Sequence, residues 1–274
     1  MADSGLEFIN LPDHVLGVDR AARADWSGPY DLDSPVREVF VTAGFLAGAG
    51  TLEIVTSVVV LPQRGTAVVA KQAAELDLLT SGRLRLGVGV GWNDVEYAAL
   101  GACFTSRGRL FDEQLQVLRL LWTCRSVHFD GEFHHLDGVG LWPLPVQRPI
   151  PLWLSGGPRS ETDRAGERVL SRVGQVADGW ISRPADDATA VARSAALVRR
   201  EAESAGRDPA GIGIQATIRV NGPHELAGVA SRIDALRSAG VSHVSFDSSR
   251  ADTTPARQSE LLDQLGRIAR QWTI

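Results

Sequence analysis

Two kinds of apolar pattern alternate along the chain. One is a short run rich in β-branched residues, which is typical of strands. The other repeats apolar residues every three to four positions, which is typical of helices that bury one face. The first kind predicts strands over residues 6–11, 52–61, 83–91, 151–155, 178–182, 211–220 and 242–247. The second predicts helices over residues 34–48, 66–82, 94–100, 107–122, 159–173, 224–239 and 256–272, with another that ends at Ser204.

The order of these elements predicts the fold class. Strand and helix alternate seven times, which indicates an α/β protein with a parallel sheet and right-handed crossovers. The 274 residues are close to the size of a TIM (β/α)8 barrel, which needs about 250 residues. The chain begins directly on a strand, so we expect a barrel that lacks the first β-α unit and a natural start upstream of Met1. We expect one domain over residues 1–274.

An insertion interrupts the alternation at about residues 124–150. Two strand-like runs flank Asp130-Gly131, a hairpin signal. Four prolines within residues 143–151 then favour an extended segment that leads into the next strand. The histidines of the insertion fit no standard zinc spacing, so we expect surface histidines and no metal site. They are His128, His134 and His135.

Composition and charge narrow the classes of partner. The net charge of −5 is spread along the chain, which argues against nucleic acid as the main partner. The start of the chain lacks the basic and apolar pattern of a signal peptide. Glu53 interrupts the most apolar stretch, residues 39–62, which is expected to form a helix and a strand rather than a membrane span. We therefore expect a cytoplasmic protein with no membrane partner.

Cys103 and Cys124 have no partner motif and are expected to be buried and unpaired.

The first candidate for chemistry comes directly after the first expected strand. In a parallel barrel the functional groups stand after the carboxyl ends of the strands. Asp13 and His14 occupy this position, where an acid beside a histidine can orient the imidazole for proton transfer. The pair is therefore the candidate catalytic pair. A turn aspartate beside a surface histidine would explain the same dipeptide.

A second candidate comes after the strand over residues 151–155. Gly156 and Gly157 let backbone N–H groups approach a ligand, and Pro158 is expected to open a helix whose N-terminus favours an anion. An ordinary turn between a strand and a helix would also contain glycine and proline.

Glycine occupies alternate positions of the strand over residues 83–91, at Gly87, Gly89 and Gly91. Alternate positions of a strand share one side, so this side leaves room for a flat ring. Tight packing inside a barrel explains the pattern equally well. The spacing matches neither the dinucleotide fingerprint nor the P-loop.

Five motifs in order carry a family resemblance. The chain resembles the bacterial luciferase-like monooxygenase superfamily, especially the branch that uses the deazaflavin coenzyme F-420. The resemblance covers nearly the whole chain. The motifs span residues 10–16 (NLPDHVL), 56–101, 107–123, 129–158 and 176–182 (VADGWIS).

The resemblance implies a cofactor site on this barrel. Asp13 and His14 would stand at the ring end of the cofactor. Ser57-Val58 would be a non-proline cis peptide that supports the face of the ring, and the glycine-rich strand would flank the ring. Ser155 and the two glycines after it would hold the phosphate. The residues expected to bind the cofactor are Ser57, Val58, Gly89, Gly91, Trp92, Asn93, Ser155, Gly156, Gly157 and Pro158.

The expected function is that of an oxidoreductase that transfers hydride between reduced coenzyme F-420, an 8-hydroxy-5-deazaflavin, and a small organic substrate. His14 would give or take the proton, and a homodimer is the candidate oligomer. Deazaflavin has carbon in place of the oxygen-reactive nitrogen of flavin, which favours hydride transfer over oxygenation. Trp92 stands where sugar-phosphate dehydrogenases of the superfamily carry an acidic glutamate, so a dehydrogenase with that acid is not expected.

Three alternatives stay open. One is an FMN-dependent monooxygenase of the same fold, and another is a truncated, non-catalytic paralogue that binds cofactor. The third is an unrelated barrel hydrolase, which is disfavoured because neither paired carboxylates nor a metal cluster mark the strand ends.

Overall fold

A computed structural model describes residues 5–160, 162–183, 187–249 and 254–272. The chain divides into two compact units. Ile9–Pro151 form one, here called the N-terminal unit, and Leu152–Ile274 together with Met1–Phe8 form the other, the C-terminal unit. The single domain expected over residues 1–274 stays a prediction.

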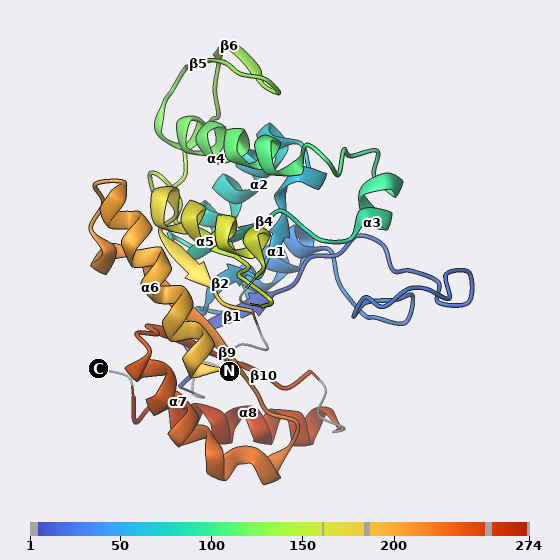
Figure 1. Ribbon diagram of the computed structural model, residues 1–274, viewed down its shortest axis with the longest axis vertical. Coiled ribbons are helices and arrows are strands. Elements are labelled where there is room, and N and C mark those ends of the chain that lie inside the picture. Colours follow the sequence, from blue (N-terminus) through green and yellow to red (C-terminus); the bar gives the residue numbers. More distant parts are fainter. Residues whose placement is uncertain (1–4, 161, 184–186, 250–253, 273–274) are drawn as a thin grey trace. The chain divides into compact units, whose positions relative to one another are not determined.

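The N-terminal unit alternates strands and helices in the predicted order (Figure 1). β4 pairs in parallel with both β2 and β3, and β2 is also the neighbour of β1. The elements are β1 (Phe8–Leu11), α1 (Val39–Ala49), β2 (Glu53–Thr56), β3 (Val59–Val60), the 3-10 turn η1 (Leu61–Gln63), α2 (Thr66–Leu79), β4 (Leu84–Gly89), α3 (Asp94–Ala99), α4 (Arg107–Thr123), β5 (Val127–Asp130) and β6 (His135–Val139).

The strand predicted over residues 52–61 is divided into β2 and β3. The peptide between Ser57 and Val58 is cis, which confirms the expectation from the resemblance. The Ser57 N–H donates to the carbonyl of Leu11 at 2.7 Å, and the Thr56 hydroxyl donates to the carbonyl of Gly87 at 2.7 Å. The residues at the division between β2 and β3 are therefore hydrogen-bonded to β1 through Leu11 and to β4 through Gly87.

Helix α1 begins at Val39, later than predicted. Glu38 is its N-cap, and the Glu38 carboxylate accepts the Val41 N–H at 2.7 Å. The predicted cap, Ser34, instead bonds to Asp31 in the preceding loop. The predicted start at Ser34 is wrong because serine followed by proline is as good a turn signal as it is a helix start.

The insertion contains the predicted hairpin, which stands beside α4 in Figure 1. β5 and β6 pair antiparallel, and the Gly131 N–H donates to the carbonyl of His134 at 2.9 Å. His128 and His135 are exposed as predicted. The His134 side chain is only 15% exposed and its Nδ1 lies 2.7 Å from Glu113 of α4, so the prediction of a surface histidine does not hold there.

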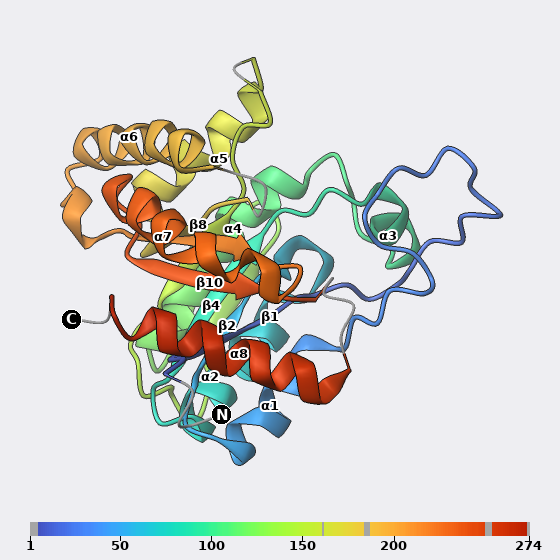
Figure 2. The same ribbon diagram turned by 90° about the horizontal axis from the view of Figure 1, so that it is seen from below.

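The C-terminal unit holds four parallel strands in the order β7-β8-β9-β10, with α5 packed beside α6 (Figures 1 and 2). Its elements are β7 (Leu152–Ser155), α5 (Arg164–Val176), β8 (Gly179–Ile181), α6 (Ala188–Ser204), η2 (Pro209–Gly211), β9 (Gly213–Arg219), η3 (Pro223–Gly228), α7 (Val229–Ser238), β10 (His243–Asp247) and α8 (Pro255–Ala269).

Trp153 fills the space that two glycines leave in this sheet. Trp153, Gly179 and Gly213 are aligned across β7, β8 and β9. A Cβ atom at Gly179 or at Gly213 would collide with the Trp153 ring. Trp153 is only 4% exposed. The two glycines therefore provide the room that a buried indole ring needs.

Both cysteines are free thiols, as the sequence predicts. Cys103 is exposed and Cys124 is half-buried, so the expected burial of the two side chains is wrong. The sequence also predicts that no segment of the chain spans a membrane. In the described part of the chain, every helix is too short or too polar to cross a membrane.

The packing of Trp153 generates a stability prediction. Gly213→Ala should lower the free energy of unfolding by about 1–3 kcal/mol, because the added methyl group forces the indole to shift. Gly211→Ala is the matched control in the same unit, since a Cβ atom there would meet nothing within 4 Å. Urea unfolding measures both variants. Equal stability of the two variants would contradict this account of the sheet.

Candidate functional site

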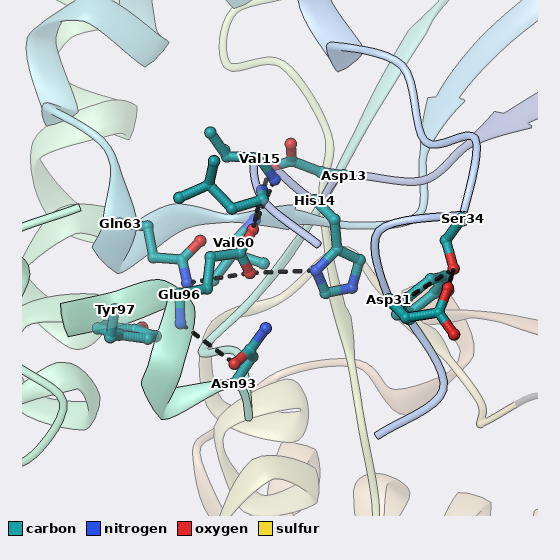
Figure 3. Close-up of polar contacts among 12 residues, drawn as sticks. Asp13, His14, Val15, Asp31, Ser34, Val60, Gln63, Asn93, Glu96 and Tyr97 are labelled. Atoms are coloured by element: carbon teal, nitrogen blue, oxygen red, sulfur yellow. Dashed lines mark hydrogen bonds and ion pairs between the residues drawn. The ribbon is translucent and has the colours of Figure 1, made fainter. Parts of the chain in front are cut away.

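A carboxylate from a distant segment holds the ring of His14. His14 lies in the loop after β1, and its Nδ1 is 3.1 Å from Oε2 of Glu96, a residue 82 positions later in α3. The Glu96 side chain is 1% exposed and that of His14 is 11% exposed. Figure 3 shows the imidazole directed at this carboxylate.

Further donors converge on the Glu96 carboxylate. Its Oε1 accepts the backbone N–H groups of Val15 at 2.5 Å and Leu16 at 3.1 Å. The side-chain amide of Gln63, at the end of η1, donates to Oε2 at 3.4 Å. The carboxylate therefore binds both the imidazole and the backbone of the next two residues (Figure 3).

These contacts set the charge of Glu96. Burial raises the pKa of the Glu96 carboxyl, whereas the hydrogen bonds from His14, Val15 and Leu16 lower it. The net result is a pKa below the ordinary value of 4.5, so Glu96 is ionised at neutral pH.

A tight turn places Glu96 next to the loop. Gly91 has a φ of 69°, and a Cβ atom there would lie 2.5 Å from Val60. Asn93 then caps α3, because its side-chain oxygen accepts the Glu96 N–H at 3.1 Å. Gly91 is therefore required by its backbone conformation and by the lack of space for a side chain beside Val60. Asn93, which the sequence predicts to bind cofactor, already uses its side-chain oxygen in the helix cap.

Asp13 does not hold the His14 ring, although the sequence suggested this role. Its carboxylate accepts two hydrogen bonds from Arg64, at 2.7 and 3.1 Å, and one from the Val60 N–H at 3.2 Å. Arg64 also bonds to Glu38 at 3.2 Å. The acid beside His14 in the sequence therefore connects the loop to Val60 of β3 and to Arg64, and Glu96 is the acid that contacts the imidazole.

Sequence reasoning missed Glu96, although a signal for it exists. The spacing from Asn93 to Glu96 is that of a helix-capping box, which marks the start of a helix. In that motif the acid turns back to its own cap residue. Here the acid binds a loop 80 to 82 positions away, which no local pattern reveals.

Two aromatic rings lie close to the His14 ring. The ring of Tyr30 lies 4.2 Å from the His14 ring and that of Trp92 lies 5.9 Å from it, centroid to centroid. Trp26 stacks on Trp92 at 5.6 Å and donates its indole N–H to the carbonyl of Tyr30 at 2.9 Å. The loop between β1 and α1 therefore brings two of these three rings to the site.

The second candidate site lies in the C-terminal unit, where helix α5 begins later than predicted. Pro158 does not open it. α5 begins at Arg164, and its N-cap Asp163 accepts the N–H groups of Gly166 at 3.1 Å and Arg159 at 2.9 Å. A carboxylate thus already caps this helix N-terminus, and the prediction that Pro158 opens the helix is wrong.

The turn before α5 forms hydrogen bonds with β8 and lies beside a buried hydroxyl. The Gly156 N–H approaches the carbonyl of Ile181 at 3.4 Å, and the Gly156 carbonyl accepts the indole N–H of Trp180 at 2.7 Å. The residue after Ile181 is Ser182, whose hydroxyl is buried and has no hydrogen-bond partner among the residues that the structure describes. An unpaired buried hydroxyl beside this turn is a feature that the sequence did not indicate.

The predicted cofactor residues fall into two groups, one in each unit. Ser57, Val58, Gly89, Gly91, Trp92 and Asn93 belong to the N-terminal unit, together with Asp13 and His14. Ser155, Gly156, Gly157 and Pro158 belong to the C-terminal unit. Their roles in cofactor binding stay predictions. In the described ranges, no group of three or more histidine, cysteine or acidic side chains could hold a metal ion.

One family model matches most of the chain. The model of the luciferase-like monooxygenase family matches residues 15–265. An uncharacterised protein of Mycobacterium tuberculosis is 30% identical over 188 residues, which is 66% of this chain and 64% of that protein. The chain thus spans slightly less than two thirds of the length of this relative.

Two relatives with named activities match shorter stretches. An FMNH2-dependent dimethylsulfone monooxygenase of Pseudomonas putida is 31% identical over 147 residues, 53% of this chain and 39% of that protein. An F-420-dependent glucose-6-phosphate dehydrogenase of Gordonia bronchialis is 35% identical over 119 residues, 42% of this chain and 32% of that protein.

Solved structures share the fold along almost the whole chain. A monooxygenase of Streptomyces bottropensis has a TM-score of 0.75 at 17% identity and covers 99% of this chain and 90% of its own. An F-420-dependent secondary alcohol dehydrogenase, solved with an F-420–acetone adduct, has a TM-score of 0.76 at 17% identity. The match covers 97% of this chain and 90% of that protein. These neighbours confirm the predicted barrel fold class.

The lowered pKa of Glu96 generates a pH prediction. A carboxylate whose folded-state pKa is depressed contributes stability that is present above its unfolded value of 4.5 and is lost as the pH falls through the folded value. Glu96→Gln should therefore flatten the fall in the free energy of unfolding between about pH 6 and about pH 3, measured by urea unfolding. The control is Glu75→Gln, since Glu75 is exposed on α2. A Glu96→Gln profile parallel to that of the wild type would contradict the assignment.

Proposed function

The chain belongs to the luciferase-like monooxygenase family, and we propose that within this family it is an oxidoreductase that uses coenzyme F-420. Its reaction is hydride transfer between F-420 and a small organic substrate, with His14 as proton donor or acceptor. The observation that carries the proposal is the imidazole held by the buried, ionised Glu96. FMN is the alternative cofactor.

The two nitrogens of His14 determine its chemistry. Nδ1 contacts Glu96, and Nε2 has no hydrogen-bond partner in the described part of the chain. When bound, F-420 supplies or accepts a hydride. With an alcohol as substrate, Nε2 would take the hydroxyl proton, and the Glu96 carboxylate would stabilise the imidazolium that forms. For a carbonyl substrate, Nε2 gives the proton back.

The turn at Ser155–Pro158 fits the anionic part of such a cofactor. We assign the phosphate to the backbone of Ser155, Gly156 and Gly157. The buried hydroxyl of Ser182 has no partner among the described residues, and it supports this assignment because a phosphate oxygen would accept its hydrogen bond. Arg183 donates to the carbonyl of Pro158 at 3.2 Å, which fixes the end of the turn.

Residues of the N-terminal unit are assigned to the ring. Ser57 and Val58 are half-buried at the division of the strand, and Gly89 ends β4. Trp92 and the cap residue Asn93 precede α3. The named relatives leave the cofactor open, since one is F-420-dependent and another uses FMNH2. The cytoplasmic location and the homodimer stay predictions.

An absorption titration decides between the cofactors. The protein is titrated separately with F-420 and with FMN, and the spectral change gives each Kd. We expect tighter binding of F-420. Tighter binding of FMN, with oxygen consumption in the presence of reduced FMN, would favour the monooxygenase alternative. Binding of neither cofactor would contradict the proposal.

Removal of the imidazole should affect chemistry more than binding. His14→Ala should lower turnover by roughly 10²–10⁴-fold, the usual contribution of positioned proton transfer. The Kd for F-420 from the titration should change little. His135→Ala is the matched control, because His135 is exposed on the hairpin. Unchanged turnover of His14→Ala at saturating cofactor would remove His14 from the mechanism.

A charge at the glycine turn tests the phosphate assignment. Gly157 has a φ of 151°, so any side chain there strains the backbone. Gly157→Ala and Gly157→Asp share this strain, and only aspartate adds a negative charge. We expect Gly157→Asp to bind F-420 and FMN much more weakly than Gly157→Ala does, at similar melting temperatures. Equal affinity of the two variants would place the phosphate elsewhere.

A further inference from the structure

The two ring nitrogens of His14 have different surroundings. Nδ1 lies 3.1 Å from Glu96 Oε2, while Nε2 has no hydrogen-bond partner within the described ranges. An ionised carboxylate only accepts hydrogen bonds. The neutral imidazole must therefore carry its proton on Nδ1, which leaves the lone pair on Nε2.

The carboxylate that makes this distinction is held rigidly. Its Oε1 is engaged by the N–H groups of Val15 and Leu16, the two residues after His14. Its Oε2 also receives the amide of Gln63. Glu96 cannot turn away from the ring without leaving two backbone donors unpaired, which is costly for groups shielded from water.

We propose that Glu96 is the positioning residue of His14, which fixes the Nδ1–H tautomer and thereby makes Nε2 the atom that exchanges a proton with substrate. The inference rests on the proposed function for its consequence in turnover, but the tautomer itself belongs to the protein alone. Asp13, the acid next to His14, is engaged with Arg64 and does not compete for the ring.

Glu96→Gln separates positioning from simple support of the loop. Glutamine has the same shape, and its side-chain oxygen still accepts the Val15 and Leu16 N–H groups. Its amide NH2 then faces Nδ1 and donates to it. Nδ1 becomes an acceptor, and the proton moves to Nε2. A role confined to holding the loop would leave the tautomer unchanged.

The hairpin offers a matched control pair. His134 Nδ1 lies 2.7 Å from Glu113, whose carboxylate also accepts the backbone N–H groups of Glu132 at 2.8 Å and Phe133 at 2.9 Å. Glu113→Gln repeats the same chemical change at a histidine that the proposal leaves out of the reaction. It should alter His134 and leave His14 as it is.

The experiment is nitrogen NMR of ¹⁵N-histidine-labelled full-length protein without cofactor, above the pH at which the imidazole is protonated. His14 signals are assigned by their loss in His14→Ala. We expect His14 as Nδ1–H in the wild type and in Glu113→Gln, and mainly as Nε2–H in Glu96→Gln. A wild-type His14 protonated on Nε2, or the same tautomer in wild type and Glu96→Gln, would overturn the proposal.

Turnover keeps this proposal distinct from the proposed function. Glu96→Gln should lower kcat by up to the roughly 10²–10⁴-fold of His14→Ala, with KM changed far less. If the tautomer switches and turnover does not change, the positioning by Glu96 holds and the proton-transfer role of His14 fails. If Glu96→Gln melts too low for study by circular dichroism, the wild-type spectrum alone decides, because Nε2–H there refutes the inference.

Discussion

One buried carboxylate organises the candidate site. Glu96 accepts a hydrogen bond from the imidazole of His14 and two more from the backbone of Val15 and Leu16. A buried charge is tolerated only where it is well bonded, and these donors are what keep Glu96 ionised. The path of the loop, the orientation of the ring and the charge beside it therefore all depend on one side chain.

The position of that carboxylate depends in turn on the connections after two strands, β3 and β4. Gly91 allows the chain to turn closely against Val60, and Asn93 starts α3 at once. On the other side of the site, Asp13 accepts the Val60 N–H and binds Arg64. The two acids therefore have different roles. Glu96 binds the imidazole ring, and Asp13 binds the Val60 N–H and Arg64.

The sequence predicted the features that periodicity and short motifs encode. The strands and most helices lie where apolar spacing placed them, and the hairpin at Asp130-Gly131 forms as expected. The cis peptide between Ser57 and Val58 was expected from the resemblance alone, since periodicity contains no such information. Helix starts failed where a local signal had two meanings, as at Ser34, whose hydroxyl serves a turn, and at Pro158, which precedes the helix cap Asp163.

The site was predictable only in part, because its decisive contacts join residues far apart in the sequence. His14 was found from its place after a strand, whereas its partner Glu96 was assigned to nothing beyond a short helix. The sequence neighbour Asp13 looked like the partner because proximity along the chain is visible and proximity in space is not. Ser182 was missed for a different reason, since a buried hydroxyl without a partner among the described residues has no sequence motif.

The anchoring of His14 from the side of α3 has an evolutionary consequence. The later part of the loop between β1 and α1 contributes Trp26 and Tyr30 to the surroundings of the imidazole, whereas His14, near the start of the same loop, has its Nδ1 held by Glu96 of α3. Substitutions in that loop beyond Leu16 can therefore change these two rings while the contact between His14 and Glu96 is kept. Under the proposed function, related chains can therefore differ in the lining of the site and still keep the same anchored imidazole.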